Sequence, residues 1–346
     1  MTAYRVGLPT SLKRADGSAH FPSYDVSPLA SEGCELAAFA STGLLPAETV
    51  SGFDSLILLG ERFTAASVPA DRRLLHIARM GVGYDTVDTA ACTANDIVLT
   101  ITPEAVRRPM AVACLTLLLA LTGRLFAKDH LTRQGPEGWA ERTRYHGLGL
   151  IGRTLGVVGL GNIGAEFVRL ARPLEMNVMA CDPFVDAETA EALGVELVDL
   201  ETLFRESDVV SLNCPLTEET HHLADTRLIG LMKPTAYLLN TARGPVVDQS
   251  ALYEALSMGR IAGAGLDVLD PEPSVYAEPL HALDNVILAP HALGWSDQMF
   301  ATMAAVNMAA VRAIREGRVP ANVVNPAVLE RPGFQARLAT RSQTAG

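Results

Sequence analysis

The sequence predicts an α/β protein made of two units, each with a parallel β-sheet. Short apolar runs alternate with segments of helical pattern along most of the chain, which is typical of parallel sheets covered by helices. The length of 346 residues corresponds to about two domains at roughly 150 residues each. With 49% hydrophobic and 19% charged residues, the composition excludes a largely disordered chain.

Four apolar runs predict the strands of an N-terminal unit of about 105 residues, a common size for such a unit. These runs are residues 4–8, 55–59, 75–77 and 97–101. An apolar helix is predicted over residues 110–121, with Pro109 in its first turn; this run is too short to span a bilayer. Residues 134–149 are rich in glycine and charge and are expected to form an arm or loop.

A second alternation of strand and helix patterns begins at Thr154. It predicts a doubly wound domain over about residues 125–292. The predicted strands are residues 155–158, 177–181, 195–198, 208–212, 237–240, 263–268 and 285–288, and the predicted helices are residues 165–171, 223–232 and 249–258. A last helical pattern, residues 297–316, is expected to pack on the first unit, which would make that unit discontinuous.

Charge and cysteine usage limit the partners and the compartment. The chain has 28 Lys and Arg against 39 Asp and Glu, a net charge of −11, and so acidic a chain is a poor ligand for nucleic acid. Its five cysteines are scattered and contain no C-x-x-C pair, so neither disulfides nor a metal site is expected. The N-terminus lacks the pattern of a secretory signal. We therefore expect a cytoplasmic protein that binds no metal, nucleic acid or membrane.

The strongest binding motif is the G-x-G-x-x-G of residues 159–164, which follows an apolar strand and opens a helix. In this context the motif is typical of a dinucleotide site. Gly159 permits the tight turn, Gly161 lets the backbone approach a pyrophosphate, and Gly164 lets the helix pack closely on the strand.

Asp182 follows the next predicted strand, 18 residues after Gly164. A carboxylate at this place accepts hydrogen bonds from the ribose hydroxyls of NAD and disfavours the 2′-phosphate of NADP. Pro183 and Phe184 come next, and the following several residues include no Arg or Lys. The sequence therefore predicts NAD as the cofactor, with a simple turn aspartate as the alternative.

Three residues suited to the oxidation of a 2-hydroxy acid follow predicted strands of the second unit. They are Arg243, Glu272 and His291, and open α/β sheets bind ligands beyond the carboxyl ends of their strands. An arginine can bind the carboxylate or carbonyl oxygen of such a substrate, a histidine can exchange the hydroxyl proton, and a glutamate can orient the imidazole. Arg243 could instead be a structural ion-pair residue.

Six segments, in order, closely resemble the D-isomer-specific 2-hydroxyacid dehydrogenase family. They are RMGVGYDTVD (79–88), TLGVVGLGNIG (154–164), PLTEETHHL (215–223), LLNTARGPVVDQSAL (238–252), IAGAGLDVLDPEP (261–273) and NVILAPHALGW (285–295). The resemblance implies two Rossmann-like domains, one flavodoxin-like and one NAD-binding, with a cleft between them. Residues 1–107 and 295–346 would form a discontinuous substrate and catalytic domain, and residues 108–294 an inserted NAD-binding domain.

The resemblance also implies roles for single residues. His291 would be the acid/base, Glu272 its partner and Arg243 the substrate-binding arginine. Val82 and Gly83 match the loop that binds the substrate carboxylate. The residues implied to bind the cofactor are Gly159, Gly161, Asn162, Ile163, Gly164, Asp182, Pro183, Cys214, Pro215, Thr220, Thr241, Ala242, Asp267 and His291. Family members are usually homodimers, so a homodimer is expected here.

Two departures from the family pattern lie near the expected cleft. Many members read N-x-x-S-V-A-E before and into the helix at residue 110, whereas this chain has Arg107, Arg108 and Pro109. Arg107 or Arg108 could bind a second anionic group of the substrate, or both could be solvated charges at the start of a helix. Trp295 could line the substrate site or pack between domains. Both changes concern the choice of substrate and not the class of reaction.

We therefore expect an NAD-dependent oxidoreductase that interconverts a small 2-hydroxy acid and a 2-keto acid, with hydride passing to or from C4 of the nicotinamide. The main alternative is an NAD(H)-sensing, corepressor-like interaction protein on the same scaffold. A third is oxidation of a different donor, such as formate or phosphite.

Overall fold

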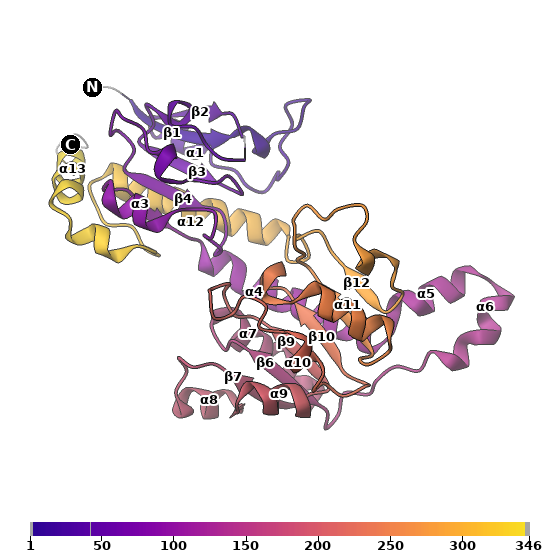
Figure 1. Ribbon diagram of the computed structural model, residues 1–346. Helices are drawn as coiled ribbons and strands as arrows, with labels where there is room; N and C mark the ends of the chain where they lie inside the picture. The colour runs from indigo at the N-terminus through magenta and orange to yellow at the C-terminus, as the bar shows by residue number, and fades with distance from the viewer. Residues whose placement is uncertain (1–2, 42, 343–346) are drawn as a thin grey trace. The chain divides into compact units, whose positions relative to one another are not determined.

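The computed structural model describes residues 3–41 and 43–342, and these divide into two compact units. Unit 1 contains Met1–Val106 and Trp295–Gly346, and unit 2 contains Arg107–Gly294. Each unit is built around its own parallel sheet (Figure 1).

In the described part of unit 1, five parallel strands form a sheet in the order β2-β1-β3-β4-β5, which is the flavodoxin-like order. The strands are β1 (Tyr4–Pro9), β2 (Cys34–Phe39), β3 (Ser55–Leu58), β4 (His76–Arg79) and β5 (Val98–Thr100). The helices are α1 (Pro28–Ser31), α2 (Ala47–Val50), α3 (Thr89–Ala94), α12 (Asp297–Arg315) and α13 (Pro332–Ser342).

The core of unit 1 lies between this sheet and its helices. All four residues of β3 are buried, as expected for a central strand of a parallel sheet that is covered on both faces. The C-terminal helix α12 lies beside β4, and Asn307 on this helix donates a 2.9 Å hydrogen bond to the hydroxyl of Tyr24. Residues from both ends of the chain therefore share one core.

Unit 2 is described throughout, and seven parallel strands form its sheet in the order β12-β11-β10-β9-β6-β7-β8. The strands are β6 (Thr154–Val158), β7 (Asn177–Cys181), β8 (Glu196–Leu197), β9 (Val209–Leu212), β10 (Tyr237–Asn240), β11 (Gly263–Leu266) and β12 (Val286–Leu288). Strand order reverses between β6 and β9, and this switch point is where doubly wound sheets bind their ligands.

Most helices of unit 2 cover this sheet, whereas α5 (Leu125–Arg133) and α6 (Pro136–Glu141) stand away from it (Figure 1). The helices after them are α7 (Asn162–Ala171), α8 (Ala187–Leu193), α9 (Leu200–Glu206), α10 (Thr226–Ile229) and α11 (Gln249–Ser257). The predicted helix over residues 223–232 is much shorter in the structure, because α10 begins after its cap Asp225 and ends at Gly230.

Helix α4 (Pro103–Thr122) differs from its prediction in length and start. Pro103, not Pro109, occupies its first turn, and Pro109 lies inside the helix, where it removes one backbone hydrogen bond. An 18-residue window of this 20-residue helix has a mean hydropathy of 1.5, so the helix meets the length and composition of a membrane-spanning helix, contrary to the expectation from the shorter run. Leu117 and Leu118 are nevertheless buried in the core beside β6, β9 and β10, which is how a core helix packs.

The segment expected to be an arm or loop is partly helical. Helices α5 and α6 project from the body of unit 2 (Figure 1), and they pack closely, because a Cβ atom at Gly138 would overlap the backbone of Leu131. Large apolar side chains on this arm are exposed, with Phe126 60% and Trp139 67% accessible. Of the two alternatives, an arm or a loop, the structure shows an arm (Figure 1), in which Pro136 begins a short helix.

Candidate active site

Each glycine of the turn after β6 occupies its position for a different physical reason. Gly159 has a φ of +90°, and a Cβ atom there would lie 2.8 Å from the backbone nitrogen of Cys214. A Cβ atom at Gly164 would overlap the carbonyl oxygen of Gly159. At Gly161, by contrast, a Cβ atom would have no described atom within 4 Å. Packing within the protein thus explains Gly159 and Gly164, whereas Gly161 leaves room for something outside it.

The N-terminus of α7 is available to an anion. No side chain within fully described unit 2 caps this helix, which begins after Gly161. Aspartates cap the four helices that follow it in unit 2, with Asp186 before α8, Asp199 before α9, Asp225 before α10 and Asp248 before α11. The free N–H groups and the dipole of an uncapped helix favour a phosphate at this place.

Asp182 lies beside the glycine turn, directly after β7. Its Oδ2 accepts a 2.8 Å hydrogen bond from the backbone N–H of Leu160, and its Oδ1 accepts one of 2.9 Å from Phe184. These bonds fix the carboxylate at the end of β7, the strand that pairs with β6 and lies next to its glycine turn. The open space at Gly161, the helix N-terminus and this carboxylate together fit a dinucleotide.

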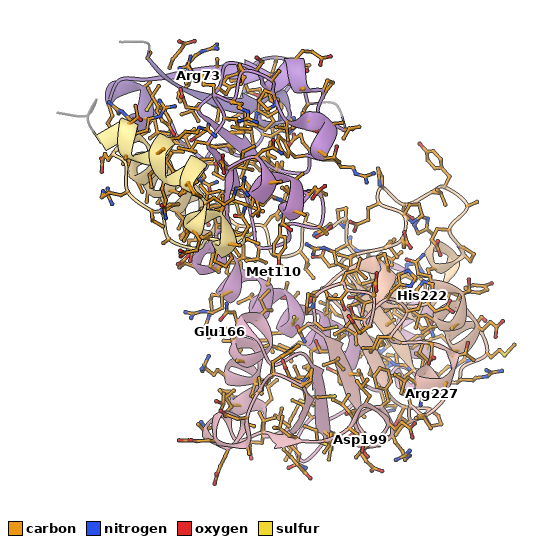
Figure 2. The ribbon with its side chains drawn as sticks, turned by 60° about the vertical axis from the view of Figure 1, so that its left-hand side comes forward. Arg73, Met110, Glu166, Asp199, His222 and Arg227 are labelled. Carbon is orange, nitrogen blue, oxygen red and sulfur yellow. The ribbon has the colours of Figure 1, made fainter. Side chains whose placement is uncertain are left out.

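The segment after β9 faces the same turn. Cys214 is buried, which raises the pKa of its thiol to about 11, so this side chain is a protonated packing residue. Thr220 closes the following loop by donating a 2.6 Å hydrogen bond to the carbonyl of Pro215. His222 (Figure 2) donates its backbone N–H to Pro245 at 2.8 Å, which connects this loop to the one after β10.

Arg243 stands on the loop after β10, and a buried amide fixes that loop. Asn240 is 1% exposed; it donates a 2.8 Å hydrogen bond to the carbonyl of Arg243 and accepts one of 3.0 Å from the N–H of Ala242. The guanidinium itself donates to the carbonyl of Ala242 at 2.7 Å. Next to them, the hydroxyl of Thr241 lies 3.1 Å from the thiol of Cys114.

Asp267 joins the end of β11 to the segment after β12. Its Oδ1 accepts 3.0 Å hydrogen bonds from the N–H groups of Ala292 and Leu293, and its carbonyl accepts the N–H of His291 at 2.7 Å. The side chain is buried, and burial raises the pKa of its carboxyl group above the ordinary value. This residue therefore fixes the backbone of the histidine and of the two residues that follow it.

His291 and Glu272 form a hydrogen-bonded pair. The Nδ1 of His291 lies 2.9 Å from Oε2 of Glu272, and Oε1 of Glu272 accepts a 3.3 Å hydrogen bond from the N–H of Leu269. Both side chains are partly accessible, 46% for the histidine and 37% for the glutamate. A Cβ atom at Gly244 would overlap the backbone of Leu269, so the loops that carry Arg243 and Glu272 pack directly against each other.

The structure thus brings the loops of Arg243, Glu272 and His291 together at the carboxyl edge of β10, β11 and β12. Sequence reasoning missed Asn240, which holds the arginine loop. Its signal was a single amide at the end of the otherwise apolar strand YLLN.

Val82, Gly83 and Trp295 belong to unit 1. The loop of Val82 and Gly83 follows β4, and Thr102 fixes its start by accepting the N–H of Gly81 at 2.9 Å. The indole of Trp295 is 47% exposed and packs edge-on against Phe21 and Phe300, with ring centroids 5.1 and 5.6 Å apart.

Arg108 has a partner within unit 2. Its Nη1 lies 2.7 Å from Oε1 of Glu166 on α7 (Figure 2), and the guanidinium is 60% exposed while the carboxylate is 10% exposed. Hydrogen bonding to Arg108 lowers the pKa of Glu166. Arg108 lies in the second turn of α4, so its expected position at a helix start was wrong.

The described residues, 3–41 and 43–342, include no cluster of three or more His, Cys, Asp or Glu that could hold a metal ion. His221 and His222 stack on each other with ring centroids 4.0 Å apart.

Comparisons with known proteins identify the family of this chain. A family model described as D-isomer specific 2-hydroxyacid dehydrogenase, NAD binding domain, matches residues 115–292. A glyoxylate reductase of Korarchaeum cryptofilum is 40% identical over 296 residues, which cover 83% of this chain and 88% of that protein. The chain belongs to the D-isomer-specific 2-hydroxyacid dehydrogenase family. Within the family, a D-3-phosphoglycerate dehydrogenase of Methanocaldococcus jannaschii is 35% identical over 280 residues, covering 80% of this chain and 53% of that protein.

Solved structures also superimpose closely on this chain. The TT0316 protein from Thermus thermophilus superimposes with a TM-score of 0.80 at 35% identity, covering 92% of this chain and 99% of that chain. The holo form of Rhodotorula graminis D-mandelate dehydrogenase gives 0.81 at 28% identity, covering 94% and 98%. The predicted family, the α/β fold of two parallel-sheet domains and NAD as cofactor are confirmed. The protein is an NAD-dependent 2-hydroxyacid dehydrogenase.

Proposed function

We propose that His291 is the acid/base of this dehydrogenase, that Glu272 orients it, and that Arg243 binds the carboxylate or carbonyl oxygen of the substrate. The observation that carries this proposal is the 2.9 Å hydrogen bond between His291 and Glu272 at the carboxyl edge of the unit 2 sheet. Because Glu272 engages Nδ1, Nε2 is the ring nitrogen that exchanges a proton with the substrate.

The cofactor supplies the acceptor or donor of the hydride when it is bound. The uncapped end of α7, from Gly161 through Asn162, Ile163 and Gly164, would hold its pyrophosphate. Asp182 and Pro183 would hold the adenosine ribose. The remaining residues proposed to line its path are Cys214, Pro215, Thr220, Thr241, Ala242, Asp267 and His291.

The proposed substrate is a small 2-keto acid such as glyoxylate, reduced to its 2-hydroxy acid. Support comes from glyoxylate reductases that are 40% identical to this chain. In this proposal unit 2 is the NAD-binding domain and unit 1 the substrate domain, whose backbone at Val82 and Gly83 binds the substrate carboxylate. Trp295 is proposed to line the substrate site. The ion pair of Arg108 with Glu166 favours a structural role for that arginine over its predicted role in substrate binding.

We further propose a cytoplasmic homodimer. All five cysteines are free thiols, which suits a reducing compartment, and the exposed apolar side chains of α5 and α6 suit a subunit contact. The comparisons give no support to the alternative of an NAD(H)-sensing interaction protein.

The test is reduction by NADH, followed at 340 nm, of glyoxylate, hydroxypyruvate, pyruvate, oxaloacetate and longer 2-keto acids. His291→Ala should lower kcat by the ~10²–10⁴-fold typical of losing a general acid/base while NADH still binds. His20→Ala, which removes an exposed histidine of unit 1, is the matched control. Unchanged turnover of the His291 variant would refute its role. NADH binding without turnover of any acid would favour the sensing alternative.

A further inference from the structure

Apolar packing does not hold the loop that carries Glu272. Every residue from 270 to 279 is described, and none is buried. The nearest buried side chains are Leu269 before the loop and Leu280 after it. A segment with little buried surface is held by its polar contacts or is mobile. The position of Glu272 therefore depends on the hydrogen bonds of this loop.

One side chain holds both backbone groups of Asp270, the first residue of this loop. Gln249 is the first residue of α11. Its Oε1 accepts the N–H of Asp270 at 2.7 Å, and its Nε2 donates to the carbonyl of Asp270 at 2.8 Å. An amide is the side-chain group that offers a donor and an acceptor side by side, so Gln249 pairs with Asp270 much as a neighbouring strand would.

Two carboxylates keep this amide in place. Asp248 caps α11 by accepting the N–H groups of Ser250 and Ala251, which fixes the backbone from which Gln249 extends. Glu278 lies at the far end of the loop, with Oε2 3.3 Å from Nε2 of Gln249. Because a carboxylate only accepts hydrogen bonds, it selects the amide orientation in which Nε2 faces it.

Asp270 lies in the chain between Leu269, whose N–H binds the carboxylate of Glu272, and Glu272 itself. Glu272 accepts the N–H of Leu269 on one side of Asp270, and it is itself two residues further along the chain. Its other oxygen faces Nδ1 of His291 at 2.9 Å. A rotation of the backbone at Asp270 would therefore change the position of the carboxylate relative to the imidazole.

We propose that Gln249 is a positioning residue for the acid/base pair: it fixes the backbone of Asp270 so that Glu272 keeps its hydrogen bond to His291. The proposal rests on the role of His291 given above. Gln249 acts through Glu272 and touches no reacting atom. The competing explanation is that the amide only stabilises the fold of a surface loop.

The first test is Gln249→Met, which keeps the length of the side chain and removes its donor and acceptor. We expect kcat to fall by roughly 10- to 100-fold, as for small misplacements of a catalytic group. KM for the keto acid and the Kd of NADH should change by less than about threefold, because the residues proposed to bind them are untouched. Ser250→Ala, an exposed neighbour in the same helical turn, is the matched control and should keep wild-type kcat.

A double-mutant cycle separates positioning from a general effect on the fold. In a Glu272→Gln background, Gln249→Met should change kcat by less than about twofold, since coupled residues give non-additive effects whereas independent ones add. Circular dichroism and the thermal unfolding midpoint of each variant confirm that folded protein is compared.

Each outcome has a distinct meaning. Wild-type kcat in Gln249→Met, or an equal loss in both backgrounds, would overturn the positioning role. A loss that disappears in the Glu272→Gln background supports it. If His291→Ala retains full turnover, the proposed function itself fails, whatever Gln249 does.

Discussion

Oδ1 of Asp267 lies 3.0 Å from the backbone nitrogen of Leu293. The same oxygen accepts the N–H of Ala292, so one buried carboxylate holds the turn that presents His291. That histidine has a φ of +54°, in the left-handed region that non-glycine residues seldom adopt without support from their surroundings. The geometry of the acid/base pair thus depends on the residue that directly follows the neighbouring strand β11.

Removing this carboxylate should destabilise unit 2. Asp267→Ala leaves the N–H groups of Ala292 and Leu293 without their acceptor, and we expect the free energy of unfolding in urea to fall by about 1–3 kcal/mol. Asp267→Asn keeps an oxygen at this place and should recover most of that loss. Equal stability of the alanine variant and the wild type would contradict the anchoring role.

The glycine turn offers a matched pair of substitutions. Gly161→Ala adds a methyl group where no described atom lies within 4 Å, so the unfolding free energy should change by less than about 0.5 kcal/mol. The same methyl group should weaken NADH binding at least tenfold, measured by fluorescence titration, because it occupies the space left for the pyrophosphate.

Gly164→Ala should reduce the stability of unit 2, unlike Gly161→Ala. Its methyl group overlaps the carbonyl oxygen of Gly159, and overpacking of this kind costs roughly 1–3 kcal/mol of stability. Thermal unfolding of the two variants side by side compares them directly. If Gly161→Ala bound NADH as tightly as the wild type, the cofactor could not lie along this turn.

Arg108→Ala distinguishes the two roles considered for that arginine. Since its guanidinium pairs with Glu166 and is largely exposed, we expect a stability loss below about 1 kcal/mol. The kcat/KM values for monoanionic and dianionic 2-keto acids should fall equally, if at all. A loss confined to dianionic substrates would instead assign Arg108 to the substrate site.

The stability of unit 1 should depend on pH through His76. This ring is fully buried, between the hydroxyls of Ser55 at 3.1 Å and Thr100 at 2.9 Å, and burial lowers the pKa of His76 to about 3. Below pH ~6.5 the unfolded chain takes up a proton that the native chain does not. The stability from His76 is therefore complete above that pH and is lost as the pH falls towards 3, at up to about 1.4 kcal/mol per pH unit.

Urea unfolding between pH 6 and pH 4 measures this dependence. His76→Asn should make the fall in unfolding free energy shallower by about that slope, compared with the wild type over the same pH range. Parallel slopes for His76→Asn and the wild type would show that the buried ring is protonated in the native state.

The sequence alone predicted the elements that depend on residues close together in the chain. The glycine turn, and the loops of Arg243, Glu272 and His291, follow strands that are recognisable as apolar runs. Strand β2 was missed because its sequence CELAAF pairs only with β1 at the sheet edge and is half exposed, so it has no continuous apolar run.

Contacts between distant residues account for the other differences. The start of α4 was placed too late, since Arg107, Arg108 and Pro109 look like a helix start, whereas the ion pair with Glu166 and the burial of Ala111 hold the helix on both sides of the proline. Gln249 was unremarkable in sequence, because its partner Asp270 is 21 residues away.

The uncapped start of α7 also has a consequence for assays of this enzyme. An N-terminus that attracts the pyrophosphate of NADH attracts any small oxyanion of similar charge. Inorganic phosphate or sulfate in the buffer should therefore compete with the dinucleotide and raise its apparent KM, so that kinetic constants measured in phosphate and in an amine buffer will differ.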